Sequence, residues 1–307
     1  MIATREEPKP IWTIAELLRW TEAHFRKLGL ATPLLDAEIL LASALGTTRL
    51  RLYTEYQKLV EPEERARFRA LVERRSRKEP VAYITGRREF YSLDLEVTPA
   101  VLVPRPETEH LVEAALAELK ARAPEAETRL LDLGTGSGNI AIAIAVNAPS
   151  VCIDAVDSSS AALEVAARNA RAHKVEDRIR FHEGDFLSGA PSGALYDVIV
   201  SNPPYISRRE YEHLMADVRL HEPRDALIDT KSPEGDGLGF YRALAAGALA
   251  IACAGALVAV EVGARASPSE TSPAAEVAEL FTSAGLRHER TVRDLAGIER
   301  VVAARVP

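Results

Sequence analysis

Apolar side chains near the start of the chain recur every three to four positions, which is the period of an amphipathic helix. The first such segment opens with Thr13 and Glu16, a pair typical of a capping box, and Gly29 supplies its stop. Further helices are predicted over 32–46 and from Pro62 onward. The positions that follow the helical spacing in the first segment are Ile14, Leu17, Leu18, Thr21, Phe25 and Leu28. The first 80 or so residues are therefore predicted to be helical.

From residue 129 onward, short apolar runs alternate with helical patterns. Strands are predicted at RLLDL, VCIDAV, IRFHEG, YDVIVSN, GALVAVEVG, RHERTVRD and ERVVAARV, and helices over 107–121, 140–146, 161–172 and 274–284. Strands that alternate with helices favour an α/β fold with a parallel, doubly wound sheet.

The segment EFYSLDLEVTPAVLV, residues 89–103, alternates enough to predict one or two short strands that connect the two parts. We therefore expect a helical N-terminal domain over 1–86, a short connecting segment over 87–104 and a larger α/β domain over 105–307. The segment ASPSETSPAA, residues 266–275, is expected to be a polar surface loop.

Composition excludes several classes of protein. The 307 residues, of which 47% are hydrophobic, are enough for two domains with cores, and no apolar run approaches the roughly 20 residues of a membrane span. The charged first residues, MIATREEPKP, do not predict a secretory signal. Cys152 and Cys253 each lie in an apolar run, which favours buried thiols over a disulfide and predicts a cytoplasmic location. Scattered histidines and the lack of a CxxC motif predict no metal site.

Charge is distributed unevenly along the chain. Residues 1–89 carry 17 Lys and Arg against 13 Asp and Glu, whereas residues 90–307 carry 21 against 32. The acidic second part would repel a phosphate backbone, so no stable binding of nucleic acid is expected. Basic residues crowd the helix that starts at Pro62, namely Arg65, Arg67, Arg69, Arg74, Arg75, Arg77 and Lys78. The plainer interpretation is a solvated helix face, and the alternative is a contact surface for an acidic partner.

A glycine-rich segment, LLDLGTGSGNI, lies between the first predicted strand of the second part and its helix. Gly134, Gly136 and Gly138 would let the chain turn sharply and let a ligand approach the backbone. Asp157, at the end of the next strand, is placed to bind the two hydroxyls of an adenosine ribose, although it could also cap the following helix. The GxGxG spacing, in place of GxGxxG, suits a ligand without phosphate, such as S-adenosylmethionine. Asp132 could face the ammonium group of such a ligand or have a structural role.

Two more candidates follow later strands. Asp185 could accept a hydrogen bond from an adenine amino group, and Phe186 could pack on the adenine ring. The next strand ends in SNPPYI, in which two prolines fix the backbone and remove two donors, so that acceptors remain for a substrate. Ligand sites in such sheets lie outside the carboxyl ends of the strands, which is where all these residues are predicted to meet.

The motif NPPY after the fourth strand is similar to that of S-adenosylmethionine-dependent methyltransferases acting on planar nitrogen. The chain resembles the release factor glutamine methyltransferases in EPVAYITGRREFYSLDLEVTPAVLVPRPETEHLVEAAL (79–116), HEPRDAL (221–227), GDGLGFYR (235–242), EVG (261–263) and DLAGIERVV (294–302). Relatives that act on ribosomal protein typically show PRSP where this chain has PRPE. Two departures are Ala266, where family members often carry glutamine, and Phe186, where tryptophan is common.

The resemblance implies a Rossmann-like, seven-stranded methyltransferase domain preceded by a helical domain and a hairpin. It implies methyl transfer from S-adenosylmethionine, which leaves S-adenosylhomocysteine, to N5 of the glutamine in the GGQ motif of class 1 peptide chain release factors. The cofactor contacts that it implies are Gly134, Thr135, Gly136, Ser137, Gly138, Asp157, Phe186 and Asn202, to which our own interpretation adds Asp185. The substrate contacts that it implies are Asn202, Pro203, Pro204 and Tyr205. We expect a monomer.

The chemistry assigned to this motif follows from the weak nucleophilicity of an amide nitrogen. The side-chain oxygen of Asn202 and the carbonyl of Pro203 would each accept one N–H of the substrate amide, and Tyr205 would pack against the amide plane. Two alternatives remain open at this point. An adenine methyltransferase shares NPPY but needs a basic groove or a target-recognition domain, and a cofactor-binding module without catalysis would need a defective pocket.

Overall fold

The computed structural model describes residues 12–122, 128–264 and 272–307. The chain divides into two compact units, Met1–Thr85 and Gly86–Pro307, and each is described by itself. The hairpin that was predicted as a linker belongs to the second unit.

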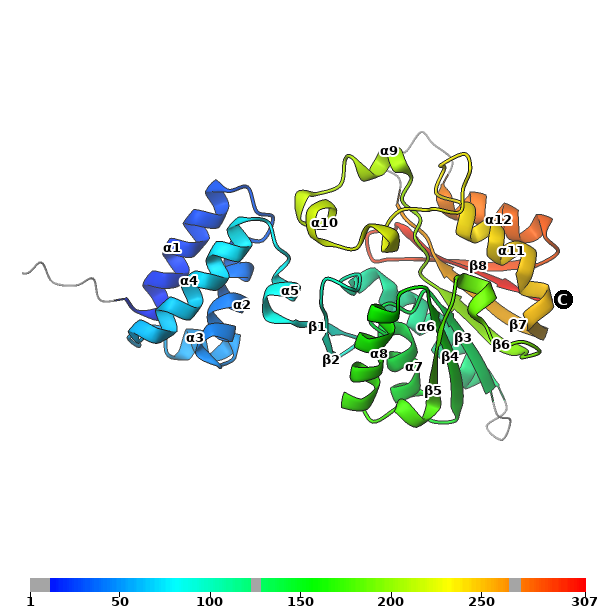
Figure 1. Cartoon of the computed structure of the whole chain (residues 1–307), viewed down its shortest axis with the longest axis horizontal. Helices are drawn as coiled ribbons and strands as arrows, with labels where there is room; N and C mark the ends of the chain where they lie inside the picture. The colour runs from blue at the N-terminus through cyan, green and yellow to red at the C-terminus, as the bar shows by residue number, and fades with distance from the viewer. Residues whose placement is uncertain (1–11, 123–127, 265–271) are drawn as a thin grey trace, which may run out of the picture. The chain divides into compact units, whose positions relative to one another are not determined.

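The first unit is helical. Its helices are α1 (Ile14–Lys27), α2 (Pro33–Leu45), α3 (Arg49–Thr54), α4 (Pro62–Ser76) and α5 (Val81–Thr85) (Figure 1). The predicted capping box is present, because Thr13 accepts from the Glu16 amide and the Glu16 side chain accepts from the Thr13 amide. Gly46 ends α2 in the left-handed conformation that glycine adopts without a steric penalty. The core of this unit comes from one face of each helix, with Phe25, Leu40, Leu41 and Leu52 fully buried.

Helix α4 is not simply a solvated basic face. The side chain of Arg75 is only 5% exposed, and its Nε lies 2.7 Å from Oδ2 of the buried Asp36 on α2. Arg74 pairs with Glu79, and Arg67 donates to the Ala44 carbonyl. Arg75 therefore pairs inside the helical unit, whereas Arg69 is exposed.

The second unit begins with the hairpin β1 (Arg87–Phe90) and β2 (Leu93–Glu96). Its two-residue turn places both Tyr91 and Ser92 at positive φ, the geometry that a tight hairpin turn requires. Glu109 accepts from the Tyr91 amide at 2.9 Å and so helps to hold this turn. The hairpin is anchored to the α/β body, because the Asn169 side chain accepts from the Glu96 amide and donates to the Glu96 carbonyl.

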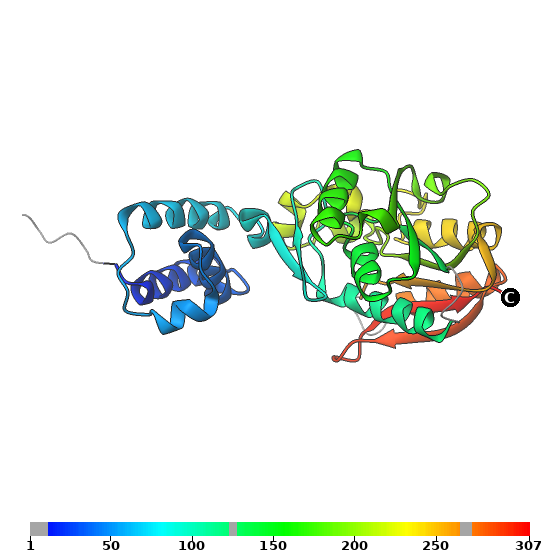
Figure 2. The same ribbon diagram turned by 90° about the horizontal axis from the view of Figure 1, so that it is seen from below.

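A seven-stranded sheet forms the centre of the second unit, in the order β5-β4-β3-β6-β7-β9-β8 (Figure 1). The strands are β3 (Thr128–Leu133), β4 (Val151–Asp157), β5 (Ile179–Glu183), β6 (Tyr196–Ser201), β7 (Ala252–Glu261), β8 (Arg287–Arg293) and β9 (Glu299–Arg305). This confirms the doubly wound, seven-stranded α/β fold. The expectation of a parallel sheet is confirmed from β5 to β7 and is wrong at β9, which pairs antiparallel with both β7 and β8. The loop between β8 and β9 is too short for the crossover connection that parallel neighbours need, so β9 runs antiparallel to β8. The two strands lie together at one edge of the unit (Figure 2).

Helices cover both faces of this sheet. One face packs against α6 (Glu109–Ala121), α7 (Asn139–Asn147) and α8 (Ser160–Ala172), and the other packs against α11 (Gly239–Ile251) and α12 (Pro273–Ser283). Alternate residues of one strand serve the two layers, since Leu130 belongs to the first core and Leu131 to the second. Sequence patterns missed α11 and the segment before it, which holds α9 (Arg208–Tyr211) and α10 (Ala216–His221). The short 3-10 turns are η1 (Pro106–Thr108), η2 (Glu176–Arg178), η3 (Phe186–Gly189) and η4 (Arg224–Ala226).

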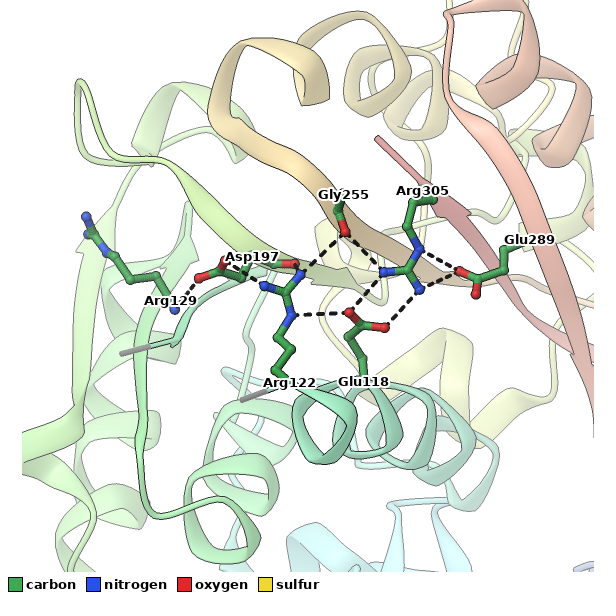
Figure 3. Close-up of polar contacts among 7 residues, drawn as sticks. All are labelled: Glu118, Arg122, Arg129, Asp197, Gly255, Glu289 and Arg305. Atoms are coloured by element: carbon green, nitrogen blue, oxygen red, sulfur yellow. Dashed lines mark hydrogen bonds and ion pairs between the residues drawn. The ribbon is translucent and has the colours of Figure 1, made fainter. Parts of the chain in front are cut away.

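An ion-pair network ties α6 to the amino ends of the central strands (Figure 3). Arg122, just after α6, donates to the carboxylate and the backbone carbonyl of Asp197 at the start of β6. Arg305 at the end of β9 pairs with Glu118 and Glu289, and both arginines reach the Gly255 carbonyl. The network fixes the end of the sheet that lies opposite the carboxyl ends of the parallel strands.

No helix among the described residues is long and apolar enough to cross a membrane. Within the same ranges, no group of three or more His, Cys, Asp or Glu side chains is arranged to hold a metal ion. Cys152 and Cys253 are thiols that form no disulfide, and both are partly buried. Ala266, and most of the loop predicted over 266–275, lie outside the described residues.

Candidate functional site

A cavity of about 490 Å³ opens at the carboxyl ends of β3, β4 and β6, within the second unit. Residues from each predicted motif line it: Gly134, Gly136, Asp157, Asp185, Phe186, Asn202, Pro203 and Pro204. The volume lies in the range of typical small-molecule sites. The structure thus brings together residues that are up to 70 positions apart in the chain.

The glycine-rich turn follows β3 and leads into α7. Gly134, Gly136 and Gly138 have φ of 77°, 55° and 80°, which favour glycine at all three positions. A Cβ at Gly138 would lie 2.9 Å from Ile142 and 3.1 Å from Ala166, so this glycine lets α7 and α8 pack closely. Gly136 has open space around it, which leaves its backbone accessible from the cavity.

Thr135, Ser137 and Gly138 do not line the cavity. Thr135 is buried and donates to the Asp132 carboxylate at 2.7 Å. The Ser137 carbonyl accepts from the Asn169 side chain, and its own hydroxyl is buried. These two polar residues therefore shape the turn from behind, and their predicted contact with a cofactor stays a prediction.

Asp157 ends β4 and faces both the turn and the cavity. Its carboxylate accepts from the Gly136 amide at 2.8 Å and from the Ser159 amide at 2.9 Å. Burial raises the pKa of Asp157, and these backbone donors oppose that shift. Ser159, not Asp157, is the N-cap of α8. Each carboxylate oxygen retains a further lone pair, so Asp157 can brace the glycine turn and still accept two ligand hydroxyls.

Asp132 lies behind the turn and is fully buried. Burial raises the pKa of its carboxyl to about 7, against the opposing hydrogen bond from Thr135. Asp132 does not line the cavity, which favours the structural one of its two predicted roles.

Asp185 and Phe186 follow β5. The Asp185 carboxylate accepts from Lys231 at 2.7 Å, a partner that the sequence did not indicate. Phe186 has a φ of 54°, and its ring meets Phe240 of α11 edge to face with the centroids 5.1 Å apart. The two rings form an apolar wall on the side of the cavity where Asp185 supplies an acceptor.

The NPPY segment leaves β6 directly beside the glycine turn. The side-chain nitrogen of Asn202 donates to the Thr108 hydroxyl at 3.1 Å, so the amide oxygen is the atom left for a ligand. Asn202, Pro203 and Pro204 line the cavity, whereas Tyr205 does not. The Tyr205 ring is held by close packing, since a Cβ at Gly263 would lie 2.8 Å from it.

Sequence reasoning missed a second wall of the cavity. It comes from the segment after the hairpin and from the segments around η4 and the start of α11: Ala100, Val101, Leu102, Pro223, Asp225, Ala226, Thr230 and Phe240. Glu222 joins two of these segments, because its buried carboxylate accepts from the Val103 amide and from Arg105. The HEPRDAL segment, which carries part of the family resemblance, was the available signal for this wall.

The charge of the cavity limits its ligand. Among the described lining residues there is no lysine or arginine, whereas Asp157, Asp185 and Asp225 contribute carboxylates. Such a site disfavours phosphate groups and favours a ligand with positive charge. Adenosine joined to a cationic amino-acid chain fits these acceptors, because Asp157 can accept from the ribose and the apolar wall can cover the base.

Comparisons with family models and with known relatives agree with one another. The family model described as "PrmC N-terminal domain" matches residues 16–86, and the one described as "Methyltransferase small domain" matches residues 111–229. A release factor glutamine methyltransferase of Rhodopirellula baltica is 42% identical over 95% of this chain and 96% of its own length. Proteins of the same name from Geobacter sulfurreducens and Burkholderia pseudomallei are 40% and 42% identical, each over 98% of this chain.

Proposed function

The chain belongs to the release factor glutamine methyltransferase family, and on that premise we propose how its residues carry out the reaction. The enzyme transfers a methyl group from S-adenosylmethionine to the side-chain amide nitrogen, N5, of a glutamine in a peptide chain release factor. The substrates are class 1 release factors, and the glutamine is that of their GGQ motif. The adenine methyltransferase and the non-catalytic module have no observation in their favour.

The observation that carries this proposal is the orientation of the Asn202 amide at the wall of the cavity. Its nitrogen donates to Thr108, so its oxygen can accept one N–H of the substrate carboxamide. The carbonyl of Pro203 accepts the other N–H, on a backbone that Pro203 and Pro204 make rigid. Tyr205, fixed against Gly263, supports the far side of the same turn and meets the amide plane of the substrate.

These contacts address the weak nucleophilicity of the amide, whose nitrogen lone pair is delocalised into its carbonyl. Gripping both N–H groups orients the nitrogen, and such positioning can contribute about 7–11 kcal/mol in well-oriented reactions. S-adenosylmethionine, when bound, supplies an electrophilic methyl group on a positively charged sulfur. As the new N–C bond forms, the C–S bond breaks and its electron pair stays on sulfur, which leaves S-adenosylhomocysteine. The nitrogen then loses one proton to solvent, so no general base is assigned.

The cofactor is held by the opposite side of the cavity. Asp157 accepts from the ribose hydroxyls, and the turn from Gly134 to Gly138, with Thr135 and Ser137, brings the backbone close to the ligand. Asp185 accepts from the adenine amino group while Lys231 steadies its carboxylate. Phe186 packs on the adenine ring with Phe240 behind it. Asn202 lies between the cofactor and the substrate.

The domain roles follow the three predicted segments. Residues 1–86 recognise the release factor, the hairpin segment 87–104 assists, and residues 105–307 carry out the transfer. The exposed part of helix α4, with Arg69, meets an acidic surface of the release factor, whereas Arg74 and Arg75 are committed to contacts within their own unit. The enzyme acts as a cytoplasmic monomer without stable binding to nucleic acid.

Mass spectrometry of a release factor after incubation with the enzyme and S-adenosylmethionine tests this function. We expect one added methyl group on the GGQ glutamine and none on a matched release factor in which that glutamine is replaced by alanine. Methylation of another residue, or of an adenine-containing oligonucleotide in place of the release factor, would contradict it.

A further inference from the structure

Two buried side chains lie in line behind Asn202. Thr108 ends η1 and is 1% exposed, and Glu261 ends β7 and is 2% exposed. The Asn202 side-chain nitrogen donates to the Thr108 hydroxyl at 3.1 Å, and the Thr108 side chain also acts as a donor that lowers the pKa of the nearby Glu261 carboxyl. Oε2 of Glu261 is buried without a hydrogen-bond partner among the described residues. Three side chains from three distant segments thus form one chain that ends at the cavity.

The number of available protons fixes which group donates and which accepts in the hydrogen bonds between Asn202, Thr108 and Glu261. An ionised carboxylate only accepts hydrogen bonds, and a threonine hydroxyl has a single proton to give. When Thr108 donates that proton to Glu261, it offers only a lone pair to Asn202. The Asn202 amide must then turn its NH2 group toward Thr108 and its oxygen the other way. A flipped amide would present N–H groups to a substrate that needs an acceptor.

We propose that Thr108 and Glu261 are positioning residues that set the orientation of the Asn202 amide, so that its oxygen accepts from the substrate glutamine. This inference rests on the proposed function and adds residues from the PRPETE and EVG segments to it. Neither residue lines the cavity, so both act through Asn202.

The charged groups around Glu261 determine how pH affects the hydrogen bonds between Glu261, Thr108 and Asn202. Arg105 and Glu107 face it from the segment before α6, and Arg300 faces it from β9. The Tyr205 ring lies near it, and the hydroxyl of Tyr241 on α11 donates to its backbone carbonyl at 2.7 Å. Burial raises the pKa of Glu261 to about 7. Below that pH the protonated carboxyl can donate to Thr108, which frees the Thr108 proton for Asn202 and favours the flipped amide.

Substitution of Thr108 tests the inference most simply. In Thr108→Val the Asn202 nitrogen loses its acceptor, and the amide gains by turning its NH2 group toward water in the cavity. Leaving a buried N–H without a partner shifts such an equilibrium by about tenfold to a hundredfold, and kcat should fall by that factor. Thr108→Ser should restore kcat to within about threefold, because it keeps the hydroxyl. The matched control Thr282→Val makes the same change at an exposed position of α12 and should leave kcat unchanged.

A second set of measurements separates positioning from mere structural support. In an Asn202→Ala background, Thr108→Val should cause no further loss of kcat, because Thr108 then has nothing to orient. Glu261→Gln should abolish the rise of kcat between about pH 6 and pH 8 that the wild type shows. Additive losses, or an unchanged pH profile in Glu261→Gln, would overturn the inference.

A readout without turnover keeps this inference distinguishable from the proposed function. In NMR spectra, the side-chain NH2 of Asn202, assigned by its loss in Asn202→Asp, should be protected from solvent exchange in the wild type. Its exchange should be at least tenfold faster in Thr108→Val, whatever the substrate is. Equal exchange in the two proteins would refute the hydrogen-bond chain even if the release factor is methylated.

Discussion

The buried ion pair between Arg75 and Asp36 allows a quantitative test of what stabilises the helical unit. Its guanidinium is 5% exposed and lies 2.7 Å from Oδ2 of Asp36, which is equally buried, and it donates to the Glu79 carbonyl at 3.0 Å. Arg75→Met keeps the aliphatic volume and removes the charge. The Asp36 carboxylate would then stay buried, and among the described side chains it would keep the hydrogen bond from the Thr32 hydroxyl. Removing one partner of a buried ion pair typically costs about 3–5 kcal/mol.

The assay can report on this unit alone, because both tryptophans of the chain, Trp12 and Trp20, lie within it. Guanidinium unfolding followed by tryptophan fluorescence should show a loss of about 3–5 kcal/mol in the free energy of unfolding for Arg75→Met. The melting temperature of a unit of this size falls by about 4–8 °C for each kcal/mol lost. In thermal unfolding, the melting temperature of Arg75→Met should therefore be lower by roughly 12 °C or more.

Two controls frame this result. Arg69→Met, at an exposed position on the same helix, should change the free energy of unfolding by less than about 0.5 kcal/mol. The double variant Asp36→Leu with Arg75→Met removes both charges and should recover most of the stability. A loss below about 1 kcal/mol in Arg75→Met alone would refute the reasoning, because a buried carboxylate cannot lose its cation so cheaply.

Three further predictions concern the second unit. Asp157→Asn should weaken S-adenosylhomocysteine binding about tenfold by calorimetry, because one backbone N–H loses its acceptor; unchanged affinity contradicts the site. Gly138→Ala should lower the free energy of unfolding by at least about 1–2 kcal/mol in urea, followed by circular dichroism, since φ is 80°. Because the pKa of Asp132 is raised to about 7 in the folded protein, its carboxyl makes its full contribution to the free energy of unfolding below about pH 4. That stabilisation is lost as pH rises through 7, and Asp132→Asn should remove this decline.

The general layout of the site could be predicted because it depends on local patterns. Buried strands followed by glycines or by Asp157 and Asn202 place those residues at the carboxyl ends of neighbouring strands in any doubly wound sheet. The structure brings these residues to one cavity. The direction of β9 could not be predicted, because side-chain alternation is the same in parallel and antiparallel strands.

Partners that are distant in sequence account for most of what was missed. The basic run on α4 reads as a solvated face, and only the packing of α2 against it reveals the pair between Asp36 and Arg75. Lys231 reaches Asp185 across 46 positions, and Thr108 reaches Asn202 across 94. No periodicity encodes such contacts, because they depend on how separate elements are placed around the sheet.

The rate of methyl transfer by Asn202→Ala, measured together with its affinity for S-adenosylhomocysteine, tests the central claim most directly. Single-turnover transfer of a labelled methyl group to a release factor should slow by about a hundredfold or more, while the variant folds normally and its cofactor affinity changes far less. Transfer at a near-normal rate would contradict the account, because the substrate amide would then need no acceptor at this position.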